Sequence, residues 1–327
     1  MTQKQNKKKM GESVTTKPDS SLALQIDKLS KRYSGNKEYS ILNLDFNVKK
    51  GQFHGFIGAN GAGKTTTIKS IVGAYANFEG SVHIFGKKHS TIEAKKMLGY
   101  IPENTRFPKG LTTYQFIYYL SRMSGVSKEK AKKHTIQVLE DVNMTKLAKK
   151  NPNTFSSGQK KKVLLAQALV HDPEVIIMDE PAANLDPQAR AEFFQTLKNL
   201  TKKGKTIFIS SHILAEIEHY IDSLTILDGG KVVFTGLLEE ISHQGDFKYE
   251  VALAETKELN NFINENNLKA NKNIVDFIED KNVHKFLAFV TKNKLHLTKF
   301  VIFKKNLQDI YNDNVKLGSM QTKKEGK

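Results

Sequence analysis

The segment from Gly58 to Thr66 has the residue types and spacing that bind a chain of phosphates. It reads Gly-Ala-Asn-Gly-Ala-Gly-Lys-Thr-Thr and fits the pattern G-x-x-x-x-G-K-[ST]. The glycines let the backbone turn tightly, so that successive N–H groups point at one anion. Lys64 can reach the terminal phosphates, and the Thr65 hydroxyl is a ligand that suits Mg²⁺. The predicted phosphate-binding residues are Gly58, Asn60, Gly61, Gly63, Lys64, Thr65 and Thr66.

The segments on either side of this loop are predicted to be a strand and a helix, the elements that flank a phosphate-binding loop. Residues 53–57 are predicted to form a short buried strand, and residues 66–72 a helix. A helix that begins here directs its positive N-terminal end at the same anion. The alternative is a glycine-rich turn beside a solvated lysine, and the order of strand, glycines, Lys-Thr and helix disfavours it. The sequence therefore predicts a nucleotide site.

Two carboxylates end a second apolar strand. Residues 175–178 are Val-Ile-Ile-Met, and Asp179 and Glu180 follow them directly. Carboxylates at the end of a buried strand are costly unless a metal ion or a water molecule uses them. Asp179 suits the outer coordination sphere of Mg²⁺, and Glu180 suits the polarisation of an attacking water. A strand that simply ends in charged residues is the alternative.

Three other positions carry groups whose role the local pattern leaves open. Tyr33 lies on a polar loop 25 residues before Gly58, where its ring is either a platform for adenine or an ordinary half-buried tyrosine. His212 follows a predicted strand at residues 206–210, at the edge where an α/β sheet holds its ligands. It is predicted to donate to the terminal phosphate, against the more common structural role of a lone histidine. Ser156 begins a predicted helix and offers either a second anion site or a plain helix cap.

The order of the predicted elements indicates an α/β fold with a helical insert. Strands are predicted at residues 22–26, 41–48, 53–57, 81–85, 175–178 and 206–210, with a hairpin over residues 223–235. Residues 112–150 are predicted to be mostly helical, and they separate the phosphate loop from the later strands. The fold class is therefore a P-loop nucleotide-binding core with an antiparallel β subdomain and a helical subdomain.

The pattern changes after residue 244. Predicted strands at 249–254, 274–278 and 297–303 alternate with helices at 259–266, 283–291 and 307–311. Such interleaving favours a small C-terminal α+β domain over residues 245–315. No catalytic set of residues is evident in it. A stabilising or dimerising role is the favoured interpretation, with regulation or partner docking as the alternative.

Composition limits the class of protein. The chain has 327 residues, no cysteine and a formal charge of +17. No apolar run approaches the roughly 18 residues that span a bilayer, and no secretory signal is evident at the start. The basic tails, residues 1–20 and 316–327, are predicted to be disordered and hold only part of the positive charge. The charge favours an anionic partner, membrane headgroups or nucleic acid, unless lysine is simply the common polar residue of the source.

Taken together, residues 22–241 resemble the nucleotide-binding subunit of an ATP-binding cassette (ABC) transporter, which predicts an ABC ATPase domain over residues 21–244. Tyr33 matches the adenine-stacking aromatic of that family, residues 58–66 its Walker A loop, and residues 175–180 its Walker B strand. Phe-Ser-Ser-Gly-Gln at 155–159 matches the signature motif, residues 184–186 the D-loop, and His212 the switch histidine. A signature between Walker A and Walker B is specific to this family.

The resemblance implies ATP and Mg²⁺ as cofactors and a dimer with two shared sites. Catalysis is expected from Lys64, Glu180 and His212, and metal binding from Thr65, Asp179 and Glu103. In the family the signature acts on the nucleotide of the other subunit, which here implicates Ser156, Gly158 and Gln159. The D-loop residue Asp186 is also expected to bind the nucleotide. Glu103 stands where the family has the Q-loop glutamine, and Ser157 where it has a glycine. The added negative charge of Glu103 is expected to slow hydrolysis or change its metal dependence, while activity survives.

The predicted partners are an integral membrane permease and a second nucleotide-binding subunit. The helical insert and the Glu103 segment are expected to receive the permease, which places the protein at the inner face of the cell membrane. The glutamate at position 103 and the segment at 298–311 also resemble exporter subunits whose permease is a separate chain, the kind that moves drug, peptide or lipid-like cargo. The alternative is a soluble ABC ATPase that acts on ribosomes or nucleic acid. Such proteins usually carry two cassettes in one chain, or a long coiled coil between Walker A and Walker B. Here one cassette is present, and the 115 residues from Lys64 to Asp179 are too few for a long coiled coil, so this alternative is disfavoured. A regulatory cassette that binds ATP without turnover is the third possibility.

Overall fold

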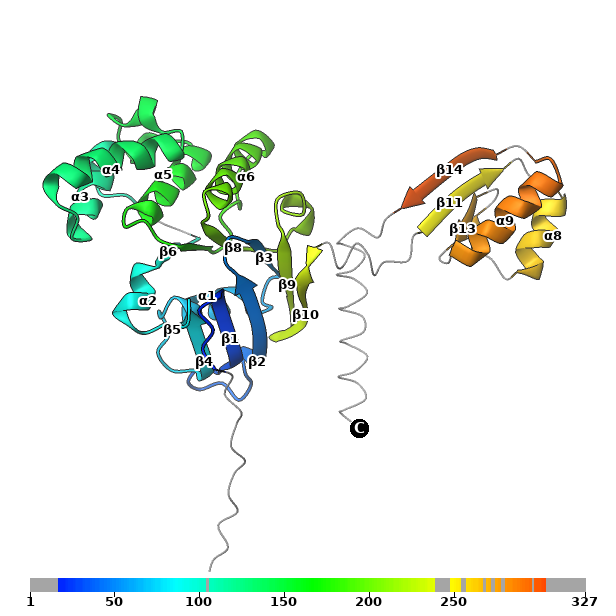
Figure 1. Ribbon diagram of the computed structural model, residues 1–327, viewed down its shortest axis with the longest axis horizontal. Helices are drawn as coiled ribbons and strands as arrows, with labels where there is room; N and C mark the ends of the chain where they lie inside the picture. The colour runs from blue at the N-terminus through cyan, green and yellow to red at the C-terminus, as the bar shows by residue number, and fades with distance from the viewer. Residues whose placement is uncertain are drawn as a thin grey trace, which may run out of the picture.

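The part of the chain that the structure describes contains three β-sheets (Figure 1). The computed structural model describes residues 17–103, 106–238, 248–253, 257–266, 269–271, 274–277, 280–295 and 297–303. The predicted tail at 316–327, the predicted helix at 307–311 and most of the predicted N-terminal tail lie outside these residues. No helix within the described part of the chain is long and apolar enough to cross a membrane.

The first sheet is antiparallel and has the strand order β2-β1-β4-β5. Its strands are β1 (Leu22–Lys31), β2 (Ile41–Lys49), β4 (Glu79–Ile84) and β5 (Lys87–Lys88). In β2, apolar side chains alternate with exposed polar ones, which is the pattern of a strand with one face in the core. This sheet corresponds to the predicted antiparallel subdomain.

The second sheet is mainly parallel and has the order β10-β9-β3-β8-β7-β6. Its strands are β3 (Phe53–Ile57), β6 (Leu98–Ile101), β7 (Val175–Met178), β8 (Thr206–Ser211), β9 (Ser223–Asp228) and β10 (Lys231–Leu237). β3 pairs in parallel with both β8 and β9, and β7 lies between β8 and β6. The carboxyl ends of these strands therefore lie along one edge, which is where such sheets bind ligands.

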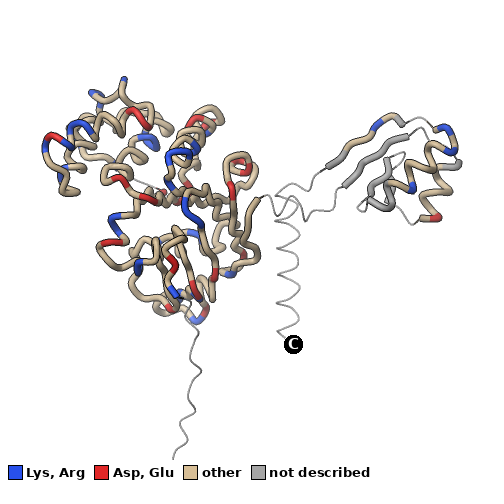
Figure 2. The backbone as a smooth tube through the Cα atoms, in the orientation of Figure 1, with Lys and Arg blue, Asp and Glu red and all other residues tan. Residues whose placement is uncertain are grey.

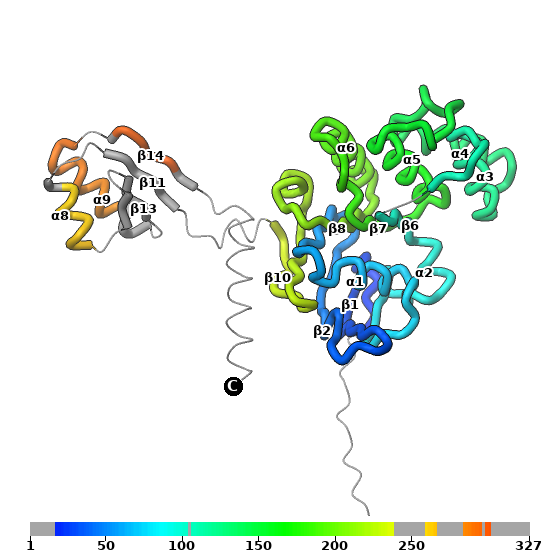
Figure 3. Tube along the Cα trace, turned by 180° about the vertical axis from the view of Figure 1, so that it is seen from behind, coloured from blue at the N-terminus to red at the C-terminus, as the bar shows by residue number. Residues whose placement is uncertain are grey.

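Helices and the antiparallel sheet cover opposite faces of the second sheet, as the two opposite views show (Figures 1 and 3). On one side lie α3 (Thr113–Met123), α4 (Lys128–Asp141), α5 (Ser157–Leu169) and α6 (Pro187–Lys202). On the other lie the antiparallel sheet and α1 (Lys64–Ile71). Two short 3-10 helices, η1 (Thr145–Leu147) and η2 (Pro152–Thr154), lead from α4 to α5, and α2 (Ile92–Lys96) precedes β6.

The side chains of each buried strand point alternately into the core under the helices and into the core under the antiparallel sheet. Ile176 and Met178 of β7 belong to the core under the helices, while Val175 and Ile177 belong to the core under the antiparallel sheet. Successive side chains of a strand point to opposite faces, so a strand with both faces covered must be apolar throughout. The continuous apolar run at residues 175–178 is thereby explained.

Close contact between α5 and β6 depends on a glycine. A Cβ atom on Gly99 would lie 2.8 Å from the carbonyl oxygen of Ala168 in α5. No side chain fits at that distance from a backbone atom, so the helix approaches the strand more closely here than another residue would allow. Glycine at position 99 is consequently needed for α5 and β6 to pack at this distance.

The third sheet contains the predicted C-terminal strands and has the order β12-β13-β11-β14. It consists of β11 (Lys248–Leu253), β12 (Lys269–Asn271), β13 (Ile274–Phe277) and β14 (Leu297–Phe303), accompanied by α8 (Lys257–Glu265) and α9 (Asp280–Lys292). Leu259, Phe286 and Val290 form the buried apolar cluster of the two helices. The α+β character of this part agrees with the prediction, although β12 was not foreseen.

Charged residues are distributed along the described chain (Figure 2). Lys and Arg are interspersed with Asp and Glu on the helices and on the antiparallel sheet, as expected for a charge that is not confined to the tails. Some of these charged side chains form ion pairs, for example Lys205 with Asp172 and Lys198 with Asp222. Such exposed pairs contribute little to stability individually.

A buried histidine makes the stability of the fold depend on pH. His54 of β3 is 1% exposed, and its Nδ1 and Nε2 atoms lie 2.8 Å from the Ser223 hydroxyl and 3.0 Å from the Thr225 hydroxyl. Its ring also stacks on Phe208. Burial lowers the pKa of His54 to about 3. The folded protein therefore holds this imidazole neutral at a pH where the unfolded chain would protonate it.

We expect the free energy of unfolding to fall by about 2 kcal/mol between pH 7 and pH 5 because of His54. Its folded pKa lies below the unfolded value, so its contribution is complete above pH 6.5 and is lost as the pH falls from there toward 3. Urea unfolding at both pH values should show this difference in the wild type and much less of it in His54→Gln. His219→Gln, which changes a histidine with 79% side-chain exposure, should leave the pH dependence unaltered. An equal pH dependence in His54→Gln would contradict the assignment.

Candidate functional site

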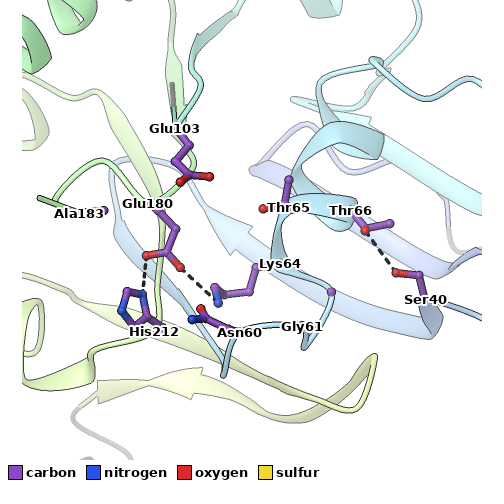
Figure 4. Close-up of a pocket in the computed structure, with 11 residues that line it drawn as sticks. Ser40, Asn60, Gly61, Lys64, Thr65, Thr66, Glu103, Glu180, Ala183 and His212 are labelled. Atoms are coloured by element: carbon purple, nitrogen blue, oxygen red, sulfur yellow. Dashed lines mark hydrogen bonds and ion pairs between the residues drawn. The ribbon is translucent and has the colours of Figure 1, made fainter. Parts of the chain in front are cut away.

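The carboxyl ends of four parallel strands gather most of the predicted residues around one cavity of about 480 Å³ (Figure 4). β3 leads into the phosphate loop, β7 into Glu180, β8 into His212, and β6 into Glu103. Nine predicted residues line the cavity: Asn60, Gly61, Gly63, Lys64, Thr65, Thr66, Glu103, Glu180 and His212. Ser40 and Ala183 line it as well and were not foreseen from the sequence.

The phosphate loop has the conformation that its glycines permit. Gly61 and Gly63 have φ angles of 83° and 105°, in the left-handed region that other residues rarely adopt. Gly58 lies so close to β9 that a Cβ atom on it would lie 2.5 Å from the Leu227 carbonyl oxygen. Gly63 directly precedes α1, so the loop opens onto the N-terminal end of that helix. The loop is therefore shaped to bring backbone N–H groups to an anion.

The Lys64 ammonium is held inside this loop. Its Nζ atom donates to the carbonyl oxygens of Gly58 and Ala59 at 2.7 Å and 3.1 Å and lies 3.2 Å from Glu180 Oε1. The side chain is 6% exposed. A buried ammonium is stable only where oxygen atoms surround it, and phosphate oxygens can take the place of these ones.

Glu180 lies between two predicted catalytic partners. Its Oε2 atom is 2.8 Å from Nδ1 of His212, while Oε1 faces Lys64, as the dashed lines in Figure 4 show. The Glu180 backbone has a φ angle of 46°, an uncommon value for a residue with a side chain. Such conformations cluster at functional sites, where the surrounding structure holds them. The arrangement suits a carboxylate that orients a water molecule against a phosphate.

Ser210 bonds to both residues that follow β7, to the carboxylate of Asp179 and to the backbone of Glu180. Its hydroxyl donates to Asp179 Oδ1 at 2.9 Å and accepts from the Glu180 N–H at 2.9 Å. Asp179 is 2% exposed, and burial and then the Asp179 charge raise the pKa of Tyr100 to about 12. Ser210 was not identified from the sequence, although it lies in the last two residues of the strand that leads to His212.

Tyr33 is hydrogen-bonded to α1, the helix that follows the phosphate loop. Its hydroxyl lies 2.9 Å from Thr66 Oγ1, and its ring meets Tyr75 edge-on with centroids 5.8 Å apart. Burial is the main cause that raises the pKa of Tyr33. The ring does not belong to the lining of the cavity described above, and Ser40 also reaches Thr66, at 3.2 Å. The adenine-stacking role of Tyr33 stays a prediction.

The signature residues lie at the start of α5, outside the lining of the cavity. Ser156 caps the helix, and its side chain and that of Gln159 bond reciprocally to each other's backbone N–H groups. A Cβ atom on Gly158 would lie 2.9 Å from the Cβ atom of Ala189 in α6, the helix that Asp186 caps. The signature residue Gly158 is therefore packed against the start of α6, while the action of the signature and of Asp186 on a nucleotide stays a prediction.

The segment that carries Glu103 is held by a residue that the sequence did not single out. Lys161 of α5 donates from Nζ to the Glu103 carbonyl oxygen at 2.8 Å. Burial lowers the pKa of the Lys161 ammonium, and the Glu103 and Asp179 carboxylates oppose that shift. The Glu103 side chain itself points toward the space between Glu180 and Thr65 (Figure 4).

The oxygen atoms around the cavity are of the kind that Mg²⁺ binds. The Thr65 hydroxyl and the Glu103 carboxylate, which line it, are hard donors, while Asp179 does not belong to the lining and accepts from Ser210. Among the described residues, no group of three or more His, Cys, Asp and Glu side chains could hold a metal ion. Mg²⁺ here would therefore depend on phosphate oxygens for part of its coordination, as is usual for this ion.

The fold and the cavity define a P-loop ATPase, and comparisons with known proteins identify its family. Residues 41–183 match the model of the family described as ABC transporter. A putative ABC transporter ATP-binding protein of Mycoplasma pneumoniae is 40% identical over 242 residues, which cover 73% of this chain and 74% of that protein. The bacitracin transport ATP-binding protein BcrA of Bacillus licheniformis is 38% identical over 68% of this chain and 70% of its own length.

A solved structure supports the same assignment. The dimeric ATP-binding cassette MJ0796, described in a post-hydrolysis state bound to ADP and Pi, has a TM-score of 0.58 and 25% identity, and the match covers 66% of this chain and 98% of that one. The chain belongs to the ABC transporter family. It is an ATP-binding subunit and an ATPase, and the predicted fold class is confirmed.

We expect Ser210→Ala to destabilise the protein by about 1–3 kcal/mol and to lower ATP turnover, because it leaves a buried Asp179 oxygen and the Glu180 N–H without their shared partner. Urea unfolding and steady-state hydrolysis measure the two effects. Ser211→Ala is the matched control, since its hydroxyl bonds only to the backbone of Ile213. If both variants lost turnover equally, Ser210 would have no special role in placing the carboxylates.

Proposed function

We propose that this chain drives a separate membrane permease that exports its cargo. The observation that carries the proposal is Glu180, held between Lys64 and His212 at the mouth of a phosphate loop. The relative BcrA is named for bacitracin transport, and another relative for linearmycin resistance, which favours export of drug-like or peptide cargo. The proposed location is the inner face of the cell membrane, through the permease.

ATP binding would redistribute the contacts of the site. The β- and γ-phosphates compete with the Gly58 and Ala59 carbonyls for the Lys64 ammonium. Glu180 then orients the attacking water, and His212 donates to the γ-phosphate. When bound, Mg²⁺ neutralises phosphate charge, and Thr65, Asp179 and Glu103 are the residues proposed to hold it.

A second subunit, identical or related, is proposed to complete each site. The signature residues and Asp186 lie outside the lining of this chain's own cavity, yet they are packed as one unit through Gly158 and Ala189. Such a unit can meet the nucleotide of a partner, with Ser156, Gly158 and Gln159 at its tip. The helix N-terminus adds a favourable dipole for the phosphate.

The permease is proposed to dock on α3. This helix carries a stacked pair of tyrosines, Tyr114 and Tyr118, and next to them Tyr119 and Met123, which are 48% and 83% exposed. Residues 119 and 123 lie on one helix face, four positions apart. Large apolar side chains of this kind are enriched in protein interfaces.

We expect Glu180→Gln to lower ATP hydrolysis by about 10²–10⁴-fold, because the amide cannot accept a proton from the attacking water. ATP binding should remain, since Lys64 and the loop are unchanged. Phosphate release at saturating Mg-ATP is the measurement. Glu174→Gln, an exposed carboxylate at the opposite end of β7, should hydrolyse ATP at the wild-type rate. Wild-type turnover in Glu180→Gln would remove this residue from the mechanism.

We expect the double variant Tyr119→Ser/Met123→Ser to lose a polytopic membrane protein that co-purifies with the wild type from membranes. The physical reason is the loss of exposed apolar area on α3. Mass spectrometry of the purified complex is the measurement, and ATP binding should not change. Ile92→Ser, which removes a 69% exposed apolar residue on α2, is the control. Co-purification of ribosomes or nucleic acid in place of a permease would support the soluble alternative.

A further inference from the structure

The turn that follows β7 has an uncommon backbone conformation at both ends. Glu180 and Asn184 have φ angles of 46° and 64°, in the left-handed region that residues with side chains rarely adopt. Within the turn, the Ala183 N–H donates to the Glu180 carbonyl and the Leu185 N–H to the Ala182 carbonyl, each at 3.2 Å. Such conformations persist only where the surrounding structure restrains them, so the contacts of this turn bear on the position of Glu180.

Arg190 restrains the far end of the turn. It lies near the start of α6, and its Nη2 atom donates to the Leu185 carbonyl oxygen at 3.1 Å. Its Nη1 atom lies 2.7 Å from Oε1 of Glu216, and the two side chains are 28% and 12% exposed. A pair that is largely removed from solvent is screened less by water and salt than an exposed one. One guanidinium therefore holds a backbone carbonyl and a carboxylate together.

Glu216 belongs to the segment that carries His212. It ends the short 3-10 helix η3 (Leu214–Glu216), four positions after His212. Leu214 is 2% exposed and Ile217 is fully buried, so apolar packing holds η3 against the core. Arg190 thus connects the turn that begins at Glu180 with the segment that begins at His212.

A cavity of about 170 Å³ lies between these two segments. Glu180 and Asn184 line it from the turn, His212 lines it from the other segment, and Arg190 and Glu216 belong to the lining as well. Because side chains leave this space unfilled, packing does not set the separation of the two segments here. The contact of Arg190 with Glu216 joins them across the gap.

We propose that Arg190 is a positioning residue for ATP hydrolysis, which connects the Leu185 carbonyl to Glu216 and so holds Glu180 and His212 at the separation where their side chains meet. That separation is 2.8 Å between Glu180 Oε2 and His212 Nδ1. The inference rests on the roles proposed above for Glu180 and His212. A catalytic group displaced by about 1 Å can lower a rate by about 100-fold, so a loosened connection should act on turnover. The phosphate loop takes no part in it, and ATP binding should not depend on it.

The test compares turnover with affinity in the purified full chain. Steady-state hydrolysis of Mg-ATP gives kcat, and calorimetric titration with a non-hydrolysable ATP analogue and Mg²⁺ gives Kd. Arg190→Gln should lower kcat about tenfold, as a partial displacement of Glu180 and His212 would, and leave Kd unchanged. Arg190→Lys keeps a cation that can donate to both oxygens and should recover most of the lost kcat.

Lys198→Gln is the matched control. Lys198 lies on the same helix, donates to the Tyr220 carbonyl oxygen at 3.0 Å and pairs with Asp222 at 2.8 Å, with 30% of its side chain exposed. It makes the same two kinds of contact as Arg190 and lines neither cavity described above. Its kcat should equal that of the wild type. If Arg190→Gln and Lys198→Gln have the same kcat, or if Arg190→Gln weakens Kd as much as it lowers kcat, the inference is wrong.

Glu216→Ala tests the connection from the other side. It should lower kcat as Arg190→Gln does, and the double variant should be no slower than either single variant, because both residues act through one contact. Losses that multiply in the double variant would contradict this. Thermal unfolding shows which variants are folded, and if Arg190→Gln does not fold, a wild-type kcat in Glu216→Ala overturns the inference.

The outcomes separate this inference from the proposed function. Wild-type turnover in Glu180→Gln would overturn both, because Arg190 would then have no catalytic pair to position. A wild-type kcat in Arg190→Gln, with Glu180→Gln inactive, would overturn the inference alone.

Discussion

The contact between Lys64 and Glu180 is the interaction on which the site depends. Both side chains are largely buried, and each is costly there without the other. The loop carbonyls of Gly58 and Ala59 complete the environment of the ammonium, and His212 completes that of the carboxylate. A phosphate chain that enters must replace these contacts with equivalent ones, so the site is arranged in advance for an anion of high charge.

The parallel sheet provides the geometry of this contact. β3 and β7 lie on either side of β8, and all three are buried on both faces. Their carboxyl ends bring the phosphate loop, Glu180 and His212 to one edge. Ser210, near the end of the central strand, then holds the Asp179 carboxylate and the Glu180 backbone N–H through one hydroxyl. Rigid strands thus place groups that are more than 100 residues apart in the sequence.

The helical layer connects this edge to the signature. α5 is fixed to β6 at Gly99 and to α6 at Gly158, each by an approach that excludes a larger residue. Lys161 lies between these two contacts on the same helix and reaches the backbone at Glu103. α5 therefore contacts β6, α6 and the Glu103 segment at once.

The sequence by itself determined the phosphate loop, the carboxylate pair after β7, the positions of most core strands and the family, because each depends on local spacing and on apolar periodicity. It did not predict β5, β6 or the order of the strands in each sheet. Its predictions for the helical insert and the C-terminal α+β unit agree with the described elements, while β12 was missed because three residues carry little periodic signal. Only the tertiary structure decided that Ser40, Ser210 and Lys161 join the site. These three lie on different elements, and no spacing rule connects a lysine on α5 with a carbonyl after β6. Packing alone brings them together, through close approaches such as that at Gly99.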